Sequence, residues 1–515
     1  MQQVLGMGQG DPGSFRRSAE LNACGSKEES APKRPRLKAI DRKQMCIRPI
    51  DIENLIDQDH PARLIWEFVG QLDLRQFHEE IRVFEGEAGR SAFDPQLLIS
   101  LWIYGYSQGV GTAREISRLC NYHPAFEWLT GMQAVNYHTL SDFRILHKEK
   151  LNDLFKQILA VLQSQGIVDL KRVFHDGSKI EANASSSSFH RKDTIEANLQ
   201  LAEKVISELE KEDPQRQSGR SEAAKKKAAH KRKETLQKAL DEFRKLPTKT
   251  HRKHEIRVSQ TDPDARKMKG PGGRYAPAYN AHITTEGKNG FIVGAQIDQC
   301  SSDSEQLHPA IEKVIENTAE KPEQVVVDSG FANKKNIIQL SQQGVQIIGP
   351  LLPQPSKEQL EKRGIDPSFG KEAFRFDRQN NQFICPAGKA LSYISSRKGK
   401  ASIEHLYQAS AIDCDNCQLK AKCCGKMKRA RRKLIHIEDL PEVASFKKVM
   451  ETEEAKKIYK QRAQFAEFPL AWIKEKFGLR RFHLRGQDKT LMELLWASLT
   501  FNILWFIRIR GLCPH

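Results

Sequence analysis

Two aspartates occupy similar positions in the sequence, each after a short run that favours a β-strand and each followed closely by glycine. Asp176 follows residues 172–174 and precedes Gly177, whereas Asp328 ends the apolar run 324–327. Carboxylates delivered by neighbouring strands can share divalent metal ions, and such ions about 4 Å apart stabilise both the attacking and the leaving oxygen in phosphoryl transfer. For Asp176 alone an ordinary turn is the alternative, because Asp is common at the first position of turns.

A metal site of this kind needs a third carboxylate, which usually comes from a helix. The best candidate is Glu467, and Glu475 and Glu493 are its rivals. Because Pro469 cannot lie inside a regular helix without a kink, the helix either begins near residue 468 or bends there. Lys474 follows Glu467 by seven residues, so on one helix the two side chains share a face. They belong either to a functional site or to a row of charged residues exposed to solvent.

The order of the motifs resembles that of the DDE transposases of bacterial insertion sequences. The residues that carry the resemblance are Asp176-Gly-Ser-Lys, Val327-Asp-Ser-Gly-Phe and then Tyr459, Arg462, Glu467 and Lys474, with further agreement in 101–106, 112–116, 139–144, 261–265, 279–282 and 482–486. One departure is the gap from Arg462 to Glu467, which holds four residues where the commonest related pattern holds three.

The resemblance implies a ribonuclease-H-like core in which Asp176, Asp328 and Glu467 hold two Mg²⁺ (or Mn²⁺) ions. It implies cleavage at the element's ends and attack of the freed 3′-hydroxyl on target DNA, with contacts to DNA from Tyr459, Arg462 and Lys474. The expected partners are terminal inverted repeats and target DNA, bound by a homodimer because two ends are cut in one event. The alternatives are a catalytically silent DNA-binding relative that acts as a repressor and a ribonuclease-H-like nuclease or resolvase.

Five of the ten cysteines lie between the second and third carboxylates. Cys414 and Cys417 form a Cys-x-x-Cys unit, which is half of a tetrahedral zinc site, and Cys385 with Cys423 would complete four thiolates. Cys424 is the alternative to Cys423, and loose reduced thiols are the alternative to a metal site. We expect a small zinc-ribbon-like insertion here.

The region before Asp176 is predicted to be helical. Asp94-Pro95 is typical of a helix start, and Thr112 and Thr139 begin two further helices. Short helices joined by tight turns, with Arg144 and Lys148 on the last of them, indicate either a helix-turn-helix type DNA reader or an ordinary helical bundle with a basic face.

The charge of the chain and the placement of its apolar residues indicate its partners and its location. The chain has 515 residues and a formal charge of +18, a field that attracts nucleic acid. The start is polar rather than signal-like, and the apolar run 491–507 contains charged Glu493, so a cytoplasmic protein with a buried C-terminal helix and no membrane partner is expected.

The fold class predicted from strands that alternate with helices is mixed α/β. The expected divisions are a disordered basic arm (1–40), a helical DNA-binding domain (41–165), the first part of the catalytic core (166–189), an inserted charged helical hairpin (190–255), the core continued (256–375), the cysteine-rich insertion (376–435) and a C-terminal helical part of the core (436–515). The basic second arm of the hairpin, 225–233, either contacts DNA or is simply solvated.

Overall fold

The computed structural model describes residues 45, 49–82, 91–211, 220–246, 256–270, 273–351, 357–399, 402–425 and 431–511. The chain divides into two units, Met1–Ile50 and Asp51–His515, and every feature described below belongs to the second. The predicted basic arm 1–40 lies outside the described residues, as does the stretch 212–219 within the predicted helical hairpin.

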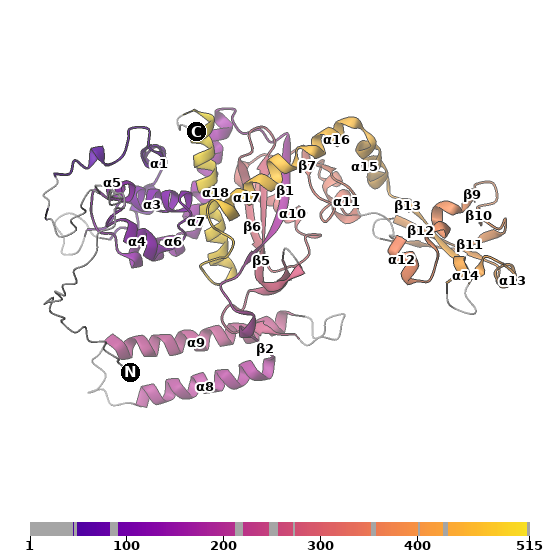
Figure 1. Cartoon of the computed structure of the whole chain (residues 1–515), viewed down its shortest axis with the longest axis horizontal. Helices are drawn as coiled ribbons and strands as arrows, with labels where there is room; N and C mark the ends of the chain where they lie inside the picture. Colours follow the sequence, from indigo (N-terminus) through magenta and orange to yellow (C-terminus); the bar gives the residue numbers. More distant parts are fainter. Residues whose placement is uncertain are drawn as a thin grey trace, which may run out of the picture. The chain divides into compact units, whose positions relative to one another are not determined.

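A mixed six-stranded sheet forms the centre of the second unit (Figure 1). Its strands run in the order β4-β5-β1-β7-β8, and β6 also pairs with β5. Their bounds are β1 (Arg172–Glu181), β4 (Arg266–Lys269), β5 (Tyr275–Glu286), β6 (Ile292–Asp298), β7 (Gln324–Val326) and β8 (Gln346–Ile348). Strand β1 is antiparallel to β5 and parallel to β7, which in turn is parallel to β8. The prediction of a mixed α/β fold is therefore confirmed.

Strand β1 corrects one detail of the sequence reading. Asp176 does not stand at a strand end before a Gly-Ser turn, because β1 continues through it for ten residues. Its neighbour β5 pairs with it along this whole stretch, and Gly177 lies opposite His282. Asp176 thus lies inside a central strand, where β1 is paired with β5 and has passed the end of its pairing with β7.

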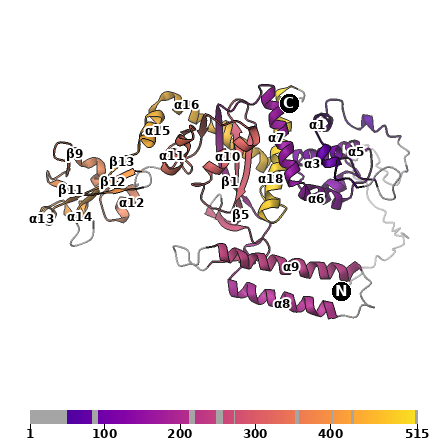
Figure 2. The same ribbon diagram turned by 180° about the vertical axis from the view of Figure 1, so that it is seen from behind.

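Helices cover both faces of the sheet. They are α10 (Leu307–Thr318), α11 (Lys334–Gln342), the π-helical segment η7 (Ala463–Glu467), α17 (Phe468–Glu475) and α18 (Gln487–Ile509). In Figure 2, α18 runs beside α7 (Lys148–Ser164), with which it is in contact. Among the described residues α18 is the one helix long and apolar enough to cross a membrane, but 78% of its apolar window is buried inside the protein. The prediction of a buried C-terminal helix is confirmed.

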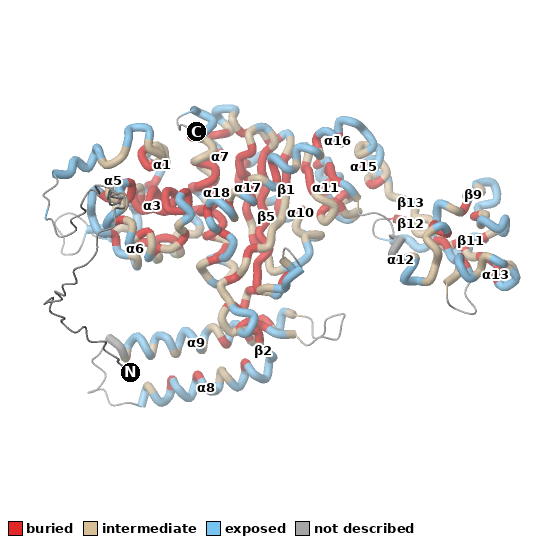
Figure 3. The backbone as a smooth tube through the Cα atoms, viewed as in Figure 1, coloured by how far each residue is buried: buried red, intermediate tan, exposed pale blue. Residues whose placement is uncertain are grey.

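The N-terminal helical region packs directly on α18. It contains η1 (Glu53–Leu55), α1 (Pro61–Gly70), α2 (Arg75–His78), α3 (Pro95–Ser107), α4 (Ala113–Leu119), α5 (Pro124–Thr130), α6 (Tyr137–Leu146) and α7. The predicted helix starts are confirmed at α3 and α4, where Asp94 and Thr112 cap the first turn, whereas α6 begins two residues before Thr139. Helix α3 is buried along nearly its whole length (Figure 3), with Trp102 beside Trp496 of α18. One hydrophobic core therefore joins these helices to the sheet.

The predicted helical hairpin is present. Helices α8 (Lys192–Lys211) and α9 (Arg220–Lys245) lie side by side in Figure 1, next to the short strands β2 (Phe189–His190) and β3 (Val258–Ser259). The contact between the two helices buries Ile195, Ala202 and Leu236, but most of both helices is exposed (Figure 3).

The cysteine-rich region forms a second sheet of five antiparallel strands in the order β13-β12-β11-β10-β9. The strands are β9 (Arg375–Asp377), β10 (Gln382–Ile384), β11 (Ala390–Lys398), β12 (Ser402–Ala409) and β13 (Lys433–Asp439). The helical elements around it are α12 (Lys357–Lys362), η5 (Pro367–Phe369), η6 (Lys371–Ala373), α13 (Ala411–Asp415) and α14 (Lys420–Cys423), and α15 (Pro441–Glu451) and α16 (Glu453–Lys460) lead back towards η7. This unit has its own small core around Phe383 and Leu391.

Candidate active site

Asp176 lies at the centre of an ion-pair cluster. Its Oδ1 is 2.9 Å from Nη2 of Arg462, whose Nη1 lies 2.7 Å from Oε1 of Glu467. The side chains of Arg462 and Asp176 are mostly buried, whereas that of Glu467 is 55% exposed. One guanidinium therefore bridges two of the three predicted carboxylates.

The local chain path explains how Arg462 and Glu467 come together. Residues 463–467 form a π-helical turn, and α17 then begins at Phe468 with Pro469 in its first turn. Proline fits that position because the backbone N–H it lacks would have no partner inside the helix. Of the two paths left open by the sequence, the structure adopts the one in which the helix starts at Phe468. The wider π turn brings Arg462 and Glu467, five residues apart, into contact, and such turns are frequent at functional sites.

Asp328 follows β7, the strand parallel to β1, as the sequence predicts. Its Oδ1 accepts hydrogen bonds from the backbone N–H groups of Gly330 (2.8 Å) and Phe331 (3.3 Å), which fix the turn after the strand. Its carboxylate interacts electrostatically with that of Asp176, as does the carboxylate of Glu467. The three predicted acids are therefore brought into one neighbourhood.

Burial raises the pKa of Asp176 above the ordinary value of an aspartate. The Arg462 guanidinium and the Gly177 N–H oppose this shift by stabilising the charged form, whereas the carboxylates of Asp328 and Glu467 add to it by repulsion. The site thus holds more negative charge than the single arginine neutralises at Asp176, and a further cation is favoured there.

Lys474 points to the same face of β1, two residues beyond Asp176. Its Nζ donates to Oγ of Ser178 and to the backbone oxygen of Lys179 at 3.1 Å. Burial lowers the pKa of Lys474, and the nearby Asp176 carboxylate opposes that shift. Asp176 and Ser178 alternate with Gly177 along the strand and so share a face, which places Lys474 beside the acidic cluster.

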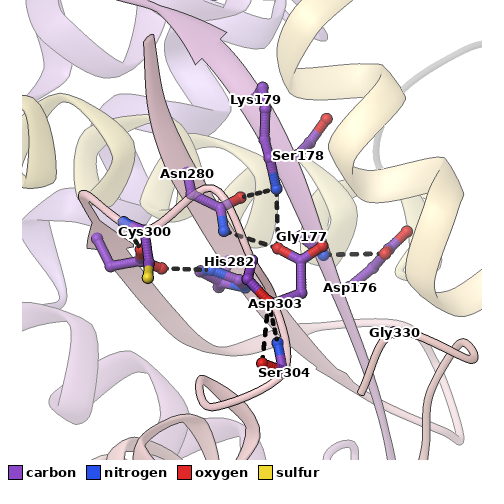
Figure 4. Close-up of polar contacts among 12 residues, drawn as sticks. Asp176, Gly177, Ser178, Lys179, Asn280, His282, Cys300, Asp303, Ser304 and Gly330 are labelled. Carbon is purple, nitrogen blue, oxygen red and sulfur yellow. Dashed lines mark hydrogen bonds and ion pairs between the residues drawn. The ribbon is translucent and has the colours of Figure 1, made fainter. Parts of the chain in front are cut away.

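The opposite face of β1 carries a polar network that sequence reasoning missed (Figure 4). Lys179 Nζ lies 2.9 Å from Oδ1 of Asn280 and 2.8 Å from Oδ1 of Asp303, and Asn280 also donates to Asp303 at 2.7 Å. The buried ring of His282 bonds Asp298 through Nε2 at 2.7 Å. No periodicity marks Asp298, the last residue of β6, or Asp303 in the segment after it, because only the fold brings them beside β5 and β1.

Gly177 follows Asp176 in β1 and lies on the face of the strand that carries the polar network. A Cβ at this position would stand 2.9 Å from two atoms of the His282 ring and 3.3 Å from Oδ1 of Asp303. Only glycine lets the His282 ring of β5 and the Asp303 carboxylate approach β1 so closely.

The two rival carboxylates have other partners. Glu475 pairs with Arg480 on the surface. Glu493 is completely buried and accepts hydrogen bonds from the backbone N–H groups of His483 and Leu484, with the Arg144 guanidinium 3.8 Å away. Neither is bridged to Asp176, so Glu467 is the third carboxylate that the geometry favours.

The predicted DNA-contacting residues have different surroundings. Arg144 is 4% exposed and donates to the backbone oxygen of Gly111 at 2.7 Å, so it packs inside the protein, and its predicted contact with DNA is corrected on this ground. Lys148 is partly exposed and pairs with Asp488 at 2.6 Å. Tyr459 is half-buried at the end of α16, beside the core that contains Phe465.

Within the described part of the chain, no group of three or more His, Cys, Asp or Glu side chains has the arrangement of a formed metal site. The donor set nevertheless fits a hard divalent cation, because Asp176, Asp328 and Glu467 offer carboxylate oxygens only. The guanidinium of Arg462 already supplies a positive charge between Asp176 and Glu467. Departure of this side chain would leave that position open for a metal ion.

Comparison with known families gives the class of the protein. Residues 384–506, which include Arg462, Glu467 and Lys474, match the family described as Transposase DDE domain. Residues 50–146, the helical region, match the Transposase domain (DUF772) family. No curated protein and no solved structure matches the chain. Both matched families are families of transposase domains, so the comparisons support a transposase function in general.

The pair of matched domains is typical of the DDE transposases of bacterial insertion sequences, so the resemblance read from the motifs is confirmed. Asp176 and Asp328 lie outside both matched segments. Their assignment rests on the sequence motifs and on the neighbourhood they share with Glu467.

Proposed function

We propose that this protein cuts DNA at the ends of its element and joins the freed 3′-hydroxyl to target DNA, with Asp176, Asp328 and Glu467 as its catalytic residues. The observation that carries the proposal is the bridge from Arg462 to both Asp176 and Glu467, with Asp328 in electrostatic range. Three carboxylates that repel one another around a single arginine are suited to bind divalent metal ions.

The sheet supports a ribonuclease-H-like core. The first aspartate lies on central strand β1, the second follows the neighbouring parallel strand β7, and antiparallel β5 and β6 extend the sheet on the other side. The third carboxylate precedes α17, and the segment that carries it contacts β1 and β5. Three separate segments therefore converge on one face of β1.

Two Mg²⁺ ions held by the three carboxylates would supply Lewis-acid stabilisation of the attacking and leaving oxygens. The chain's own residues would bind and orient the DNA. Arg462 would leave Asp176 and Glu467 and bind a phosphate instead, because a guanidinium pairs with phosphate as well as with carboxylate. Lys474 would hold a phosphate next to Ser178, and the Asp328 turn would keep its carboxylate fixed at the end of β7.

DNA recognition is proposed for the N-terminal helices, with terminal inverted repeats as the ligand. Lys148 and Tyr459 remain proposed contacts, but Arg144 does not, because it is buried. A formal charge of +18 supports attraction to DNA in general. A homodimer on DNA would bring two element ends to two active sites, and the protein would act in the cytoplasm, where bacterial DNA lies.

The test uses the full-length protein and linear DNA that carries its gene with the flanking repeats. With Mg²⁺ or Mn²⁺ we expect nicks at the repeats and joining of the new 3′ ends to a second DNA. Asp328→Ala should abolish both reactions and retain DNA binding, measured by fluorescence anisotropy. The matched control is Glu305→Ala, which removes an exposed carboxylate paired with Lys335 and should leave both reactions intact.

The outcomes distinguish the proposal from its alternatives. Unchanged nicking by Asp328→Ala would refute the assigned site. Binding by the wild-type protein without any nicking would favour a catalytically silent repressor, and nicking without joining would favour a nuclease or resolvase.

A further inference from the structure

A small cavity in the cysteine-rich unit is lined by all five cysteines of this region. Its volume is about 30 Å³, roughly the space of one water molecule or one ion. The cysteines come from four segments of chain: Cys385 follows β10, Cys414 lies in α13, Cys417 follows α13, and Cys423 and Cys424 lie at the end of α14. All five are free thiols.

A buried arginine lines the same cavity. Arg432 is 6% exposed, and its two Nη atoms donate to the backbone oxygens of Cys423 (2.9 Å) and Phe369 (2.6 Å). Its Nε has no hydrogen-bond partner, and no acidic side chain among the described residues pairs with it. The guanidinium lies over the Phe374 ring, 5.1 Å from its centroid, but a buried charge without an acidic partner is costly, so a nearby negative charge, which neutral thiols do not supply, would stabilise it.

Two lysines also line the cavity. Lys389 lies 4.0 Å from Asp413, and Lys420 lies 2.6 Å from Asp415. Each lysine is thus paired with an aspartate, which leaves Arg432 as the cation of this cavity for which the described residues supply no acidic partner. Four thiolates around a divalent metal ion carry a net charge of −2, and such a complex would place negative charge beside Arg432.

The turn that presents Cys385 is shaped for a thiolate. The N–H of Lys389 donates to the Cys385 sulfur at 3.3 Å, and the N–H of Gly388 donates to the Cys385 carbonyl at 2.8 Å. Gly388 has a φ of +73°, which glycine adopts without strain. A backbone donor aimed at sulfur stabilises the anionic ligand and fixes its direction.

We propose that Cys385, Cys414, Cys417 and Cys423 bind a single structural zinc ion in this cavity. Four thiolates favour zinc because it is borderline soft and adopts tetrahedral geometry without strain. Cys423 is preferred over Cys424 because it is the more buried of the two, belongs to the small core of this unit and accepts a hydrogen bond from Arg432 through its backbone oxygen. The sulfurs lie around the cavity rather than in a formed metal site, so binding would turn them inward.

The site would join α13, α14 and the turn between β10 and β11. The small core beside it, around Phe383 and Leu391, is the main apolar cluster of the five-stranded sheet. Zinc would therefore stabilise this sheet, and the inference does not depend on the proposed DNA chemistry.

The first experiment measures metal in the full-length protein, purified without chelators from zinc-supplemented cells. Elemental analysis should find one zinc per chain, and exchange for Co²⁺ should give the intense visible bands of a tetrahedral thiolate site. Substoichiometric zinc in the wild-type protein, or iron in its place, would overturn the proposal.

Two neighbouring cysteines provide a matched pair of variants. Cys423→Ser should lose zinc and the Co²⁺ bands, whereas Cys424→Ser should retain both. Cys300→Ser, which removes an exposed thiol elsewhere, should behave as the wild type. Arg432→Met tests the charge argument without removing a ligand, and about a tenfold loss of zinc affinity in chelator competition is expected. Retention of zinc by Cys423→Ser would refute the ligand set even if that variant is less stable.

Discussion

Removal of Arg462 is predicted to strengthen metal binding at the acidic cluster. The guanidinium bridges Asp176 and Glu467 at 2.9 Å and 2.7 Å, in the position that a divalent cation would need. A metal ion must therefore displace Arg462 before it can use both carboxylates. Arg462→Gln keeps a side chain of similar polarity and removes the competing charge.

The size of the effect follows from the bonds that the metal must break. Two unit charges about 4 Å apart attract by about 4 kcal/mol at an effective dielectric constant of about 20. The net worth of a hydrogen bond to a charged group is smaller, about 1.5–3 kcal/mol, because water competes for both groups. At about 1.4 kcal/mol per factor of ten, the first metal ion should bind roughly ten to a hundred times more tightly to Arg462→Gln.

The assay is a calorimetric titration of full-length protein with Mn²⁺ at mildly alkaline pH, where protons do not compete for the carboxylates. The matched control is Arg480→Gln, which removes an exposed arginine paired with Glu475 and should leave the affinity unchanged. DNA cleavage by Arg462→Gln should fall although metal binding improves, because the variant lacks the guanidinium proposed to bind phosphate. Unchanged or weaker Mn²⁺ binding by a folded Arg462→Gln protein would refute the reasoning.

Two further substitutions test the surroundings of Asp176. Burial raises the pKa of Asp176 in the folded protein, so ionisation of this group lowers the stability of the protein as pH rises through that raised value. Asp176→Asn should therefore raise the melting temperature at neutral pH in the presence of chelator, and the difference should vanish near the ordinary aspartate pKa of about 4. The same substitution should abolish stabilisation by Mn²⁺. Gly177→Ala places a methyl group 2.9 Å from the His282 ring and should lower the free energy of unfolding by about 1–3 kcal/mol in chemical denaturation. An unchanged free energy of unfolding would mean that β1 and the His282 ring can move apart without cost.

The sequence predicts most of the secondary structure because its signals are local. The helix caps at Asp94 and Thr112 and the buried strand before Asp328 all depend on neighbouring residues. The prediction that the strand ends at Asp176 is wrong, although Asp-Gly-Ser has the composition of a turn. Pairing with β5 along the whole of β1 overrides that local preference, and only the tertiary structure reveals it.

Side-chain environments were harder to predict, and Arg144 illustrates the reason. A basic residue on a short helix reads as a contact for DNA. Its burial depends on α18, which lies far downstream and supplies Glu493 beside it. The same limit applies to Asp303, whose position over Gly177 follows from the fold of the segment after β6. The motif order and the resemblance that it carries identified the candidate carboxylates but not the arginine bridge between them.

The two arginines at the proposed metal sites would respond to metal in opposite ways. Arg462 lies among carboxylates that it partly neutralises, so a metal ion competes with it and releases it for the phosphate backbone. Arg432 is buried beside thiols that carry no charge as such, so a metal complex supplies the negative charge that it needs. Removal of the first arginine should therefore tighten metal binding, whereas removal of the second should weaken it. The opposite changes in metal affinity would therefore distinguish a metal ion in the proposed catalytic site from one in the proposed structural site.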